Sequence, residues 1–411
     1  MAARNGRRLP ILLLGCLIAA ACTVGGVPLE GDAAVWMTSD GENWSRVIEA
    51  DLGGPGAQQM TGITSFDGGL VAVGSSALHD QDYDGRIWVS GNGTDWEVVT
   101  DPDLGGPDNQ FINAVAAAGP GLIALGHSDD GGDLDVVVWT STDGVRWERV
   151  GSSGLENRGD QVTWPLGDPV MVMGESMIIS GMDGDDAAIW ASSDGLTWSR
   201  VDTPDALSGG GEHMISELAD ATSGVVAVGW SDLDAVAWAS ADGTVWTRVD
   251  SASLASPGVQ RITGVVETET GLVAVGDSLS YEEIYFLGRG SRETSDAAVW
   301  TSTDGGAWQR IEGLEELGDQ HMYNVGALGS TLVAVGIDSP DPRTGGLFEA
   351  GPSSGRDVDG AVWTSNDGRS WTRVRSGAFG GPNWQDIFDL AELHGTLFVV
   401  GGDDTEGSSA G

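Results

Sequence analysis

The chain has 411 residues, with 62 acidic residues against 19 basic ones and a net charge of −43. Every basic residue is an arginine. This charge balance argues against nucleic acid as a partner and against electrostatic attachment of the folded body to an anionic lipid surface.

The first 21 residues predict a bacterial lipoprotein signal peptide. A positively charged start precedes an apolar stretch, Leu9 to Ala21, that is too short to span a bilayer. It ends in Ala-Ala-Ala-Cys22, which resembles a lipobox, whose Cys is diacylated and becomes the mature N-terminus. Cys16 fits the lipobox locally but leaves too short an apolar stretch, so we prefer Cys22, with simple secretion after cleavage nearby as the alternative. We expect a short linker at 22–31, attachment to the cell membrane on its extracytoplasmic face, and a folded body without cysteine.

One pattern, W-x-[ST]-x-[DN]-G-x-x-W, occurs seven times in the chain. The intervals between successive copies are 52, 51, 51, 48, 62 and 63 residues. The first tryptophans of the copies are Trp36, Trp88, Trp139, Trp190, Trp238, Trp300 and Trp363. A period near 50, made of short strands with turn residues between them, is typical of β-propeller blades.

The pattern predicts a hairpin between the two outer strands of each blade. In the sixth copy, β-prone runs flank Asp304-Gly305. Asp-Gly is a strong turn signal, because glycine tolerates positive φ and Asp accepts hydrogen bonds from nearby backbone N–H groups. We expect the two tryptophans of each copy to pack between neighbouring blades, where they would contribute large apolar areas.

A second pattern, a buried strand that ends in glycine, also occurs seven times, as in GLVAVG at 69–74. Another strand-like stretch precedes each copy, so a complete repeat has four strands. The chain begins with the two outer strands of a blade (33–47) and ends with two inner strands (386–401). We therefore predict an all-β, seven-bladed β-propeller over residues 32–402, closed by pairing these terminal halves, with a flexible tail at 403–411.

Two further regularities mark one face of this propeller. An Asp precedes each first tryptophan by four residues, as at Asp84, and we expect it to close the loop into the third strand. A Gln begins the first strand of six blades, and Glu212 takes this place in the remaining one. We expect these polar side chains to lie at one mouth of the central channel.

The repeated pattern resembles the Asp-box, or bacterial-neuraminidase repeat, of sialidases and related propellers, which reads S-x-D-x-G-x-T-W. In this chain Asp and Gly are adjacent, as in Asp143-Gly144, so each copy is one residue shorter and has no fixed Thr. The resemblance covers residues 33–401 and implies the propeller architecture. It implies little about activity, because Asp-boxes also occur in non-enzymatic propellers and face away from sialidase active sites.

A sialidase needs three arginines for the substrate carboxylate, a Tyr nucleophile paired with Glu, and an Asp acid/base, but that family's N-terminal Arg-Ile-Pro signature is absent here. Six arginines each follow a second tryptophan by two residues, on the outermost strand, where we expect ordinary solvated positions. They are Arg46, Arg149, Arg200, Arg248, Arg310 and Arg373.

Two insertions, Asp277 to Ser295 and Ile337 to Val358, account for the longest intervals. They belong to the loop face, the end of the ring that carries the connections from second to third strands and from blade to blade. Together with the nearby Arg261 they hold the residue types of a carboxylate pair and an arginine cluster for glycoside chemistry. The candidate ligand residues are Arg261, Tyr281, Glu282, Glu283, Tyr285, Arg289, Arg292, Arg343 and Arg356.

The segment Asp80-Gln81-Asp82-Tyr83-Asp84-Gly85 has the spacing that opens a calcium loop, in which alternate carboxylates converge. No bidentate Glu follows at the expected distance, and a solvated acidic loop is the alternative. Calcium at Asp80, Asp82 and Asp84 is the one metal or cofactor prediction, since the histidines show no metal-ligand spacing.

We predict an exported, membrane-anchored, monomeric propeller that acts as a binding or scaffold module at the cell envelope. Its ligand, a glycan, a peptide or an envelope protein, is expected on the loop face. No complete catalytic constellation is visible, so a sialidase-like glycoside hydrolase or lyase is the alternative, and a purely structural assembly factor is a third. Convergence of the loop arginines around Tyr281 or Tyr285 would favour the enzyme, and their separation would count against it.

Overall fold

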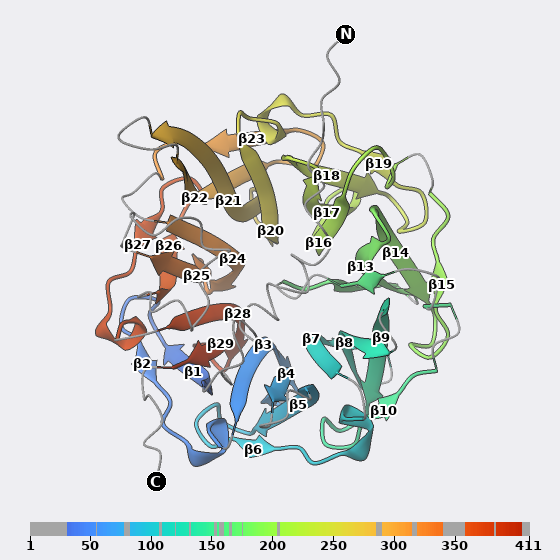
Figure 1. The fold of residues 1–411 in the computed structure, drawn as a ribbon, viewed down its shortest axis with the longest axis vertical. Helices are drawn as coiled ribbons and strands as arrows, with labels where there is room; N and C mark the ends of the chain where they lie inside the picture. Colours follow the sequence, from blue (N-terminus) through green and yellow to red (C-terminus); the bar gives the residue numbers. More distant parts are fainter. Residues whose placement is uncertain are drawn as a thin grey trace.

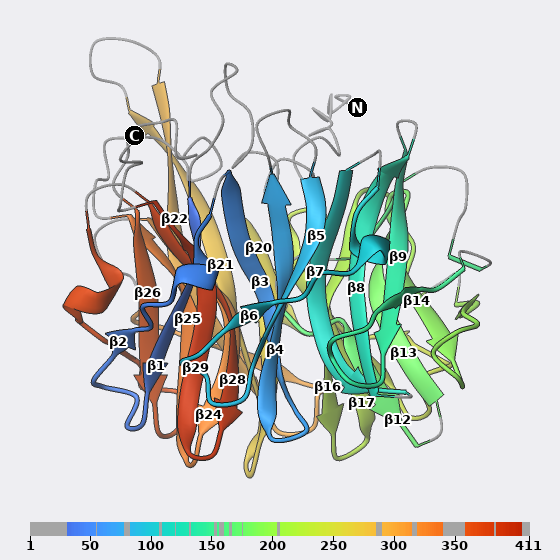
Figure 2. The ribbon, with the colours of Figure 1, turned by 90° about the horizontal axis from the view of Figure 1, so that it is seen from below.

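The computed structural model describes residues 31–54, 56–77, 83–106, 109–119, 121–130, 133–151, 154–155, 160–163, 167–174, 176–203, 206–284, 290–314, 319–339, 358–381 and 384–404. They form seven antiparallel sheets arranged as a ring around one axis, so the predicted seven-bladed, all-β propeller is confirmed (Figure 1). Seen from the side, the strands run roughly along the axis, and β1 begins and β29 ends at the loop face (Figure 2).

The strands of each blade are given from the axis outward. Blade 1 consists of β28 (Gln385–Leu393), β29 (Thr396–Asp403), β1 (Asp32–Thr38) and β2 (Ser45–Arg46). Blade 2 consists of β3 (Ala57–Phe66), β4 (Gly69–Ala77), β5 (Tyr83–Ser90) and β6 (Glu97–Val98). Blade 3 consists of β7 (Asn109–Ala118), β8 (Gly121–Asp130), β9 (Asp133–Ser141) and β10 (Glu148–Arg149). Blade 4 consists of β11 (Gln161–Val162), β12 (Val170–Met173), β13 (Ser176–Asp183), β14 (Asp186–Ser192) and β15 (Ser199–Arg200). Blade 5 consists of β16 (His213–Ala221), β17 (Gly224–Ser231), β18 (Asp234–Ser240) and β19 (Thr247–Arg248). Blade 6 consists of β20 (Val259–Thr268), β21 (Gly271–Ile284), β22 (Gly290–Ser302) and β23 (Trp308–Ile311). Blade 7 consists of β24 (Asp319–Leu328), β25 (Thr331–Ser339), β26 (Asp359–Ser365) and β27 (Thr372–Arg373).

Blade 1 closes the ring from the two ends of the chain, as predicted. Strand β1 pairs antiparallel with β29 from Asp32↔Asp403 to Thr38↔Leu397. The pairing covers the backbone edge that β29 would otherwise expose.

The repeated hairpins have the local geometry that their composition predicts. In blade 3, the backbone N–H groups of Val145 and Arg146 donate to Asp143 Oδ1 at 2.9 and 2.8 Å. The N–H of Gly144 donates to Ser141 Oγ at 2.9 Å, and Gly144 has φ of +74°, which favours glycine. These hairpins form the end of the ring opposite the loop face, which we call the hairpin face.

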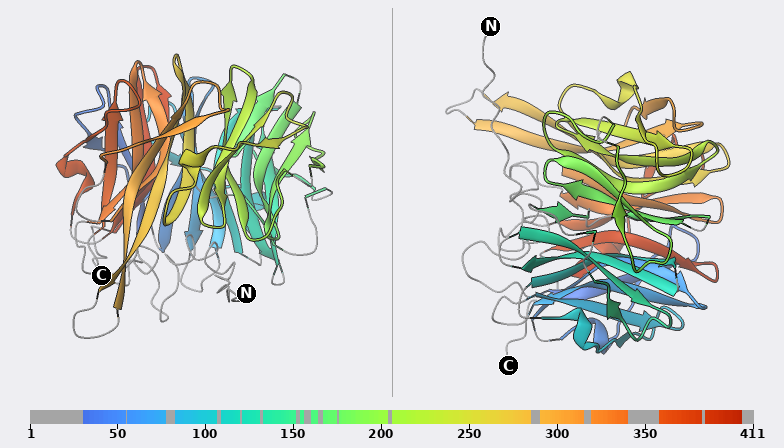
Figure 3. Two further views of the ribbon diagram at one scale, coloured as in Figure 1. Left: turned by 90° about the horizontal axis from the view of Figure 1, so that it is seen from above. Right: turned by 90° about the vertical axis from the view of Figure 1, so that its right-hand side faces the viewer.

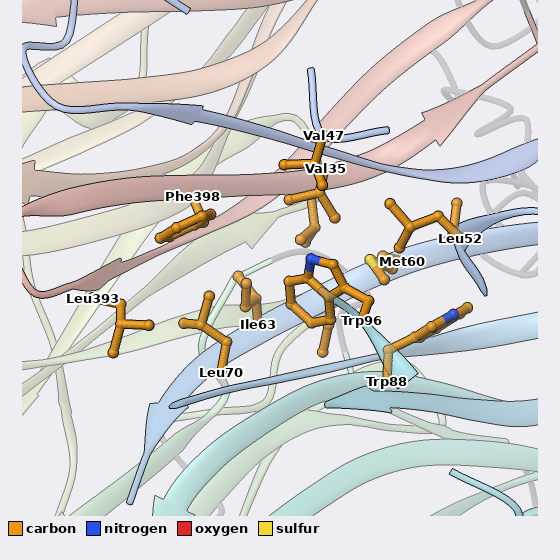
Figure 4. Close-up of a cluster of buried hydrophobic side chains, with 13 residues drawn as sticks. Val35, Val47, Leu52, Met60, Ile63, Leu70, Trp88, Trp96, Leu393 and Phe398 are labelled. Atoms are coloured by element: carbon orange, nitrogen blue, oxygen red, sulfur yellow. The ribbon is translucent and has the colours of Figure 1, made fainter. Parts of the chain in front are cut away.

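The tryptophans join each blade to the preceding one. Trp88 and Trp96 of blade 2 lie in one buried cluster with Val35 and Phe398 of blade 1 (Figure 4). Corresponding clusters occur at the other six interfaces. The prediction that the paired tryptophans pack between blades is therefore confirmed.

The first tryptophan also holds the connection that leads into its own blade. Four of these connections contain a 3₁₀ turn: η1 (Ala50–Leu52), η2 (Pro102–Leu104), η3 (Ala252–Leu254) and η6 (Gly377–Phe379). Trp139 Nε1 donates to Asp103 O in η2 at 2.8 Å, while Leu104 of the same turn is buried between blades 2 and 3. Within the described ranges, no helix has the length and hydropathy of a membrane span.

Blade 4 differs from the predicted four-strand repeat. Its innermost position is shared by two short strands, β11 and β12, which both pair with β13. The stretch between them contains Pro165, Gly167 and Pro169. Proline has no N–H for the ladder, so a continuous strand cannot pass through this stretch.

Deletion of residues 33–47 removes β2 and all of β1 except Asp32, and it tests the closure. We expect loss of cooperative unfolding and a large fall in melting temperature, because β29 loses its partner and Trp36 no longer covers blade 7. Thermal melting followed by near-ultraviolet circular dichroism provides the measurement. Removal of residues 405–411 is the control; an unchanged melt for the 33–47 deletion would contradict the closure.

Candidate functional site at the loop-face end of the axis

The innermost strands place a distinct set of side chains on the axis. In six blades the first strand has a bulge directly after its first core residue, as between Met60 and Gly62. At three bulges a small hydroxyl residue bonds to the next blade, as when Thr61 Oγ1 donates to Ile112 O at 2.8 Å. Bulges re-aim side chains and are common next to functional sites.

Large residues occupy the bulges of blades 7 and 1, and they close the axis. Tyr323 and Phe388 stack with ring centroids 5.7 Å apart and planes inclined by 25°. Phe388 belongs to a buried cluster with Met182, Met214 and Trp230, which come from blades 4 and 5 on the opposite side of the ring. This cluster, which we call the axial plug, spans the axis with apolar side chains.

A buried charged cluster lies beside the plug, between blades 6 and 7. Asp277 on β21 is within 3.6 Å of Arg261 Nε and within 3.5 Å of His321 Nδ1. Burial alone would raise the pKa of Asp277, but the charges of Arg261 and His321 outweigh burial and lower that pKa below its usual value. Asp277 is therefore ionised at neutral pH.

Asp386 on β28 is a second buried carboxyl group at the same end of the axis. Its pKa is shifted in the opposite direction from the pKa of Asp277. It accepts from Gln59 Nε2 at 3.2 Å and from Gly402 N at 2.9 Å. Burial nevertheless raises the pKa of Asp386 well above its usual value. Burial, with the charges of Asp386 and Asp277, also raises the pKa of Tyr323. The site thus combines a phenol with two buried carboxyl groups whose pKa values are shifted in opposite directions.

Three further carboxyl groups lie one layer deeper. Glu217 Oε2 accepts from Val265 N at 2.9 Å, and Asp389 Oδ2 accepts from Ile63 N at 2.7 Å, so each links its blade to the next. Burial and the charge of Asp168 raise the pKa of both Glu217 and Asp389. Partial desolvation by the surrounding blades also raises the pKa of Asp168, although its side chain is still exposed to solvent.

Of the predicted ligand residues, the described side chains include Arg261, which lies in the charged cluster. Tyr281, Glu282, Glu283 and Arg292 lie on the backbone of a long hairpin formed by β21 and β22, which continues in register to Ile284↔Gly290. Figure 3 shows this hairpin projecting beyond the rest of the loop face. Four further candidates lie outside the described residues: Tyr285, Arg289, Arg343 and Arg356.

The register shows how Arg261 and Arg292 stand relative to one another. Arg261 lies opposite Asp277, whereas Arg292 lies opposite Glu282, five residues further along β21. Five residues of antiparallel strand span about 17 Å. The backbones of the two arginines are therefore at different levels of the hairpin rather than around one point.

Three of the six arginines of the outermost strand, Arg46, Arg310 and Arg373, are half-buried rather than solvated, whereas Arg149, Arg200 and Arg248 are exposed, as expected. Arg46 pairs with Asp403, and Arg200 Nε lies 3.1 Å from Asp183 Oδ2. In blade 2, whose outermost strand has no arginine, Arg86 takes the place over the tryptophan from the third strand, 5.6 Å from the ring of Trp88. The guanidinium groups of Arg46, Arg200 and Arg373 lie near carboxylates of their own sheet, whereas those of Arg149 and Arg248 donate to the hydroxyl groups of Ser128 and Ser231.

The predicted role of the Gln residues needs two corrections. Gln260 and its counterparts are almost fully buried, so they lie inside the blades and do not line a channel mouth. In blade 5 the counterpart is His213, not Glu212, because His213 pairs with Ser231 as Gln58 pairs with Ser76. The hairpin register sets this position, whereas the prediction followed the chemical similarity of Glu and Gln.

The repeated Asp closes a different loop from the one expected. Asp84 Oδ1 accepts from Gly106 N at 3.3 Å, in the connection that leads to blade 3. Asp80 and Asp82 of the predicted calcium loop lie outside the described residues. The described part of the chain contains no group of three His, Cys, Asp or Glu side chains arranged to hold a metal ion.

The repeat pattern predicted little of this site. Glu217 and Asp389 lie at the same position of their first strands, directly after the bulge, where blades 2, 3 and 6 have Gly62, Ala114 and Gly264. An acidic residue at a position that other blades fill with apolar or small side chains was the available signal.

Comparisons with known proteins support the fold. No family model matches the chain, and no curated protein matches it. Among solved structures, a protein assigned as a 6-phosphogluconolactonase from Bacteroides uniformis is 11% identical, with a TM-score of 0.51, over 86% of this chain and 98% of its own. An α-L-arabinofuranosidase from Fusarium graminearum is 14% identical, with a TM-score of 0.46, over 82% of this chain and 97% of its own. At this identity the first match supports the fold alone, and the second supports no further conclusion.

The buried acids make stability depend on pH in a defined direction. Because the folded-state pKa values of Glu217 and Asp389 are raised, their contribution is fully present below the unfolded pKa, near 4, and is lost as pH rises through the folded values. The melting temperatures of Glu217→Gln and Asp389→Asn, measured relative to wild type at the same pH, should therefore rise progressively between pH 5 and pH 9.

Thermal melts of the wild type and the variants across this pH range give the comparison. Glu148→Gln on the exposed strand β10 is the matched control and should show no such trend. A constant difference between Glu217→Gln and wild type at all pH values would show that Glu217 is ionised in the folded protein.

Proposed function

We propose that this protein is an exported lipoprotein, anchored through Cys22, whose propeller binds a ligand on the loop face over blades 6 and 7. The observation that carries the proposal is the β21–β22 hairpin, which rises directly from Asp277, a member of the buried charged cluster. A two-stranded hairpin beside a cluster of polar groups is a suitable binding surface, because the core holds the groups that fix a ligand's orientation.

The axial plug supports binding at the surface rather than passage along the axis. Met214 and Trp230 are almost fully buried, and the cluster they form with Phe388 spans the ring. A ligand that approaches the loop face therefore meets the ends of the first strands and the hairpin. We propose a glycan, a peptide or an envelope protein as the ligand class.

Shortening the hairpin tests this proposal. Replacement of residues 282–292 by Asn-Gly keeps Tyr281 opposite Glu293 and gives a two-residue turn that suits a hairpin. Binding to glycan and peptide arrays and to isolated cell envelopes should fall at least tenfold, while the melting temperature stays within a few degrees of wild type.

Two controls accompany this variant. Arg146→Ala, on the hairpin face, changes a side chain that is 89% exposed and should leave binding unchanged. Cys22→Ser should move the protein from the membrane fraction to the soluble fraction. Wild-type binding by the shortened variant would refute the location of the ligand site.

A glycoside hydrolase is the second candidate, and the two carboxyl groups near the axis favour it. Burial raises the pKa of Asp386, whereas the pKa of Asp277 is lowered beside Arg261. Glycosidases pair a protonated carboxylic acid with a carboxylate, and environments that separate two pKa values in this way assign the acid and the base.

Fluorogenic glycosides, including sialosides, measure this activity directly. If the chain is a hydrolase of this kind, Asp386→Asn and Asp277→Asn should each reduce kcat by at least a hundredfold, because each removes a proton donor or a carboxylate. Gln385→Glu, one residue from Asp386 but inside the blade, is the control. Absence of turnover by the wild type across the substrate panel would exclude this candidate.

A further inference from the structure

We propose that the loop face is turned toward the membrane and that its ligand is a membrane-embedded protein with a positively charged extracytoplasmic segment. The inference rests on the proposed anchoring through Cys22. It follows from where the chain enters the propeller, how few residues separate that point from the anchor, and the charge of the loop face.

The first strand of the chain begins at the loop face. Asp32 starts β1 opposite Asp403, which ends β29, so the chain enters blade 1 where the second-to-third strand connections of the other blades lie. This entry point is fixed to the neighbouring blade, because Gln58 N donates to Gly31 O at 2.8 Å.

The tether is too short to permit the opposite orientation. Eight residues lie between Cys22 and Gly31, so the nine Cα–Cα steps from one to the other reach at most about 32 Å when fully extended. The first strands of the blades have up to 10 residues, so the ring is about 30 Å tall. To place the hairpin face on the membrane, the tether would have to pass over β2 to the rim and then descend this whole height.

The β21–β22 hairpin is long enough to extend over much of the distance between the propeller and the bilayer. Ser278 lies opposite Asp296, the blade 6 counterpart of Asp32, so it marks the level at which the chain enters blade 1. The hairpin continues six residues beyond Ser278 to Ile284, which is about 20 Å of strand. Its tip therefore stands within the distance that the tether allows between propeller and bilayer.

Charge distinguishes the kind of partner. Residues 277–295 contain four acidic and two basic side chains, a net charge of −2, and residues 337–358 have the same balance. With a total charge of −43, the face would be repelled by anionic headgroups and attracted to basic protein segments. A membrane protein with a basic extracytoplasmic loop is the partner that satisfies both the geometry and the charge.

Energy transfer in lipid vesicles tests the orientation. After processing, the body has no cysteine besides the acylated Cys22, so Glu283→Cys and Val145→Cys each accept one donor dye, on the hairpin and on the hairpin face respectively. With acceptor-labelled zwitterionic lipid, the full-length anchored protein should show stronger transfer from position 283. Insertion of 30 Gly/Ser residues after Gly26 should reduce the difference, because the tether then permits both orientations.

The outcomes separate the inference from the function on which it rests. Protein that fails to enter the vesicles or the cell membrane refutes the anchoring. Anchored protein with equal transfer from both positions, or stronger transfer from position 145, refutes the orientation.

The partner class has its own test. The soluble Cys22→Ser protein should not bind vesicles that contain phosphatidylglycerol at physiological ionic strength; binding would make the lipid the ligand and overturn the proposed protein partner. A photocrosslinker at position 283 in intact cells should attach to membrane proteins, with a yield that falls as salt rises, whereas one at position 197 should not. Equal yields from both positions would overturn the docking surface.

Discussion

Each blade of this propeller depends on the blade before it, because the paired tryptophans of one blade cover the face of its predecessor. The outermost strands of six blades have only two residues, so a single blade cannot cover its own apolar faces. Trp36 and Trp44 of blade 1 pack on Val333 and Val335 of blade 7, and through this contact the dependence runs around the whole ring. Stability is therefore a property of the closed ring, and the pairing of β1 with β29 is required for every interface.

Because the repeated residues build the interfaces between blades, the side chains near the axis can differ from blade to blade. The repeated tryptophans, turns and outer arginines serve contacts within and between blades, whereas the inner ends of the first strands link neighbouring blades through side chains that differ from blade to blade. Blade 2 places Thr61 at its bulge, and blade 7 places Tyr323 at the same position. The candidate site consists of such positions, which explains why it has no counterpart in the repeat.

The sequence predicted the architecture well, because each feature occurs seven times and each copy supports the same interpretation. The number of blades, the four-strand plan, the closure and the tryptophan packing all follow from the repeat. The break in blade 4 was missed because Ser176 to Gly181 and the hairpin box are intact there, and the irregularity is confined to the stretch around Gly167.

The site was harder to predict, because its members come from different blades and their meeting depends on register and bulges. Arg261 was identified from its proximity to an insertion, but its partners Asp277 and His321 were not. Asp386 and Gln59 are 327 residues apart and meet because the ring closes. A bulge shifts the register by one residue, so alternation alone gives the wrong facing for every residue beyond it.

The bulges also account for the buried acids. Glu217 and Asp389 each follow a bulge and accept the backbone N–H of a residue in the next blade, Val265 and Ile63. A buried N–H without an acceptor is costly, so an acceptor is needed at these points. A carboxyl group fills that role while protonated, and burial keeps it so. In a chain with a net charge of −43, neutral acids at the centre add no further repulsion. The ionised Asp277 is tolerated in the same region because the guanidinium group of Arg261 compensates its charge.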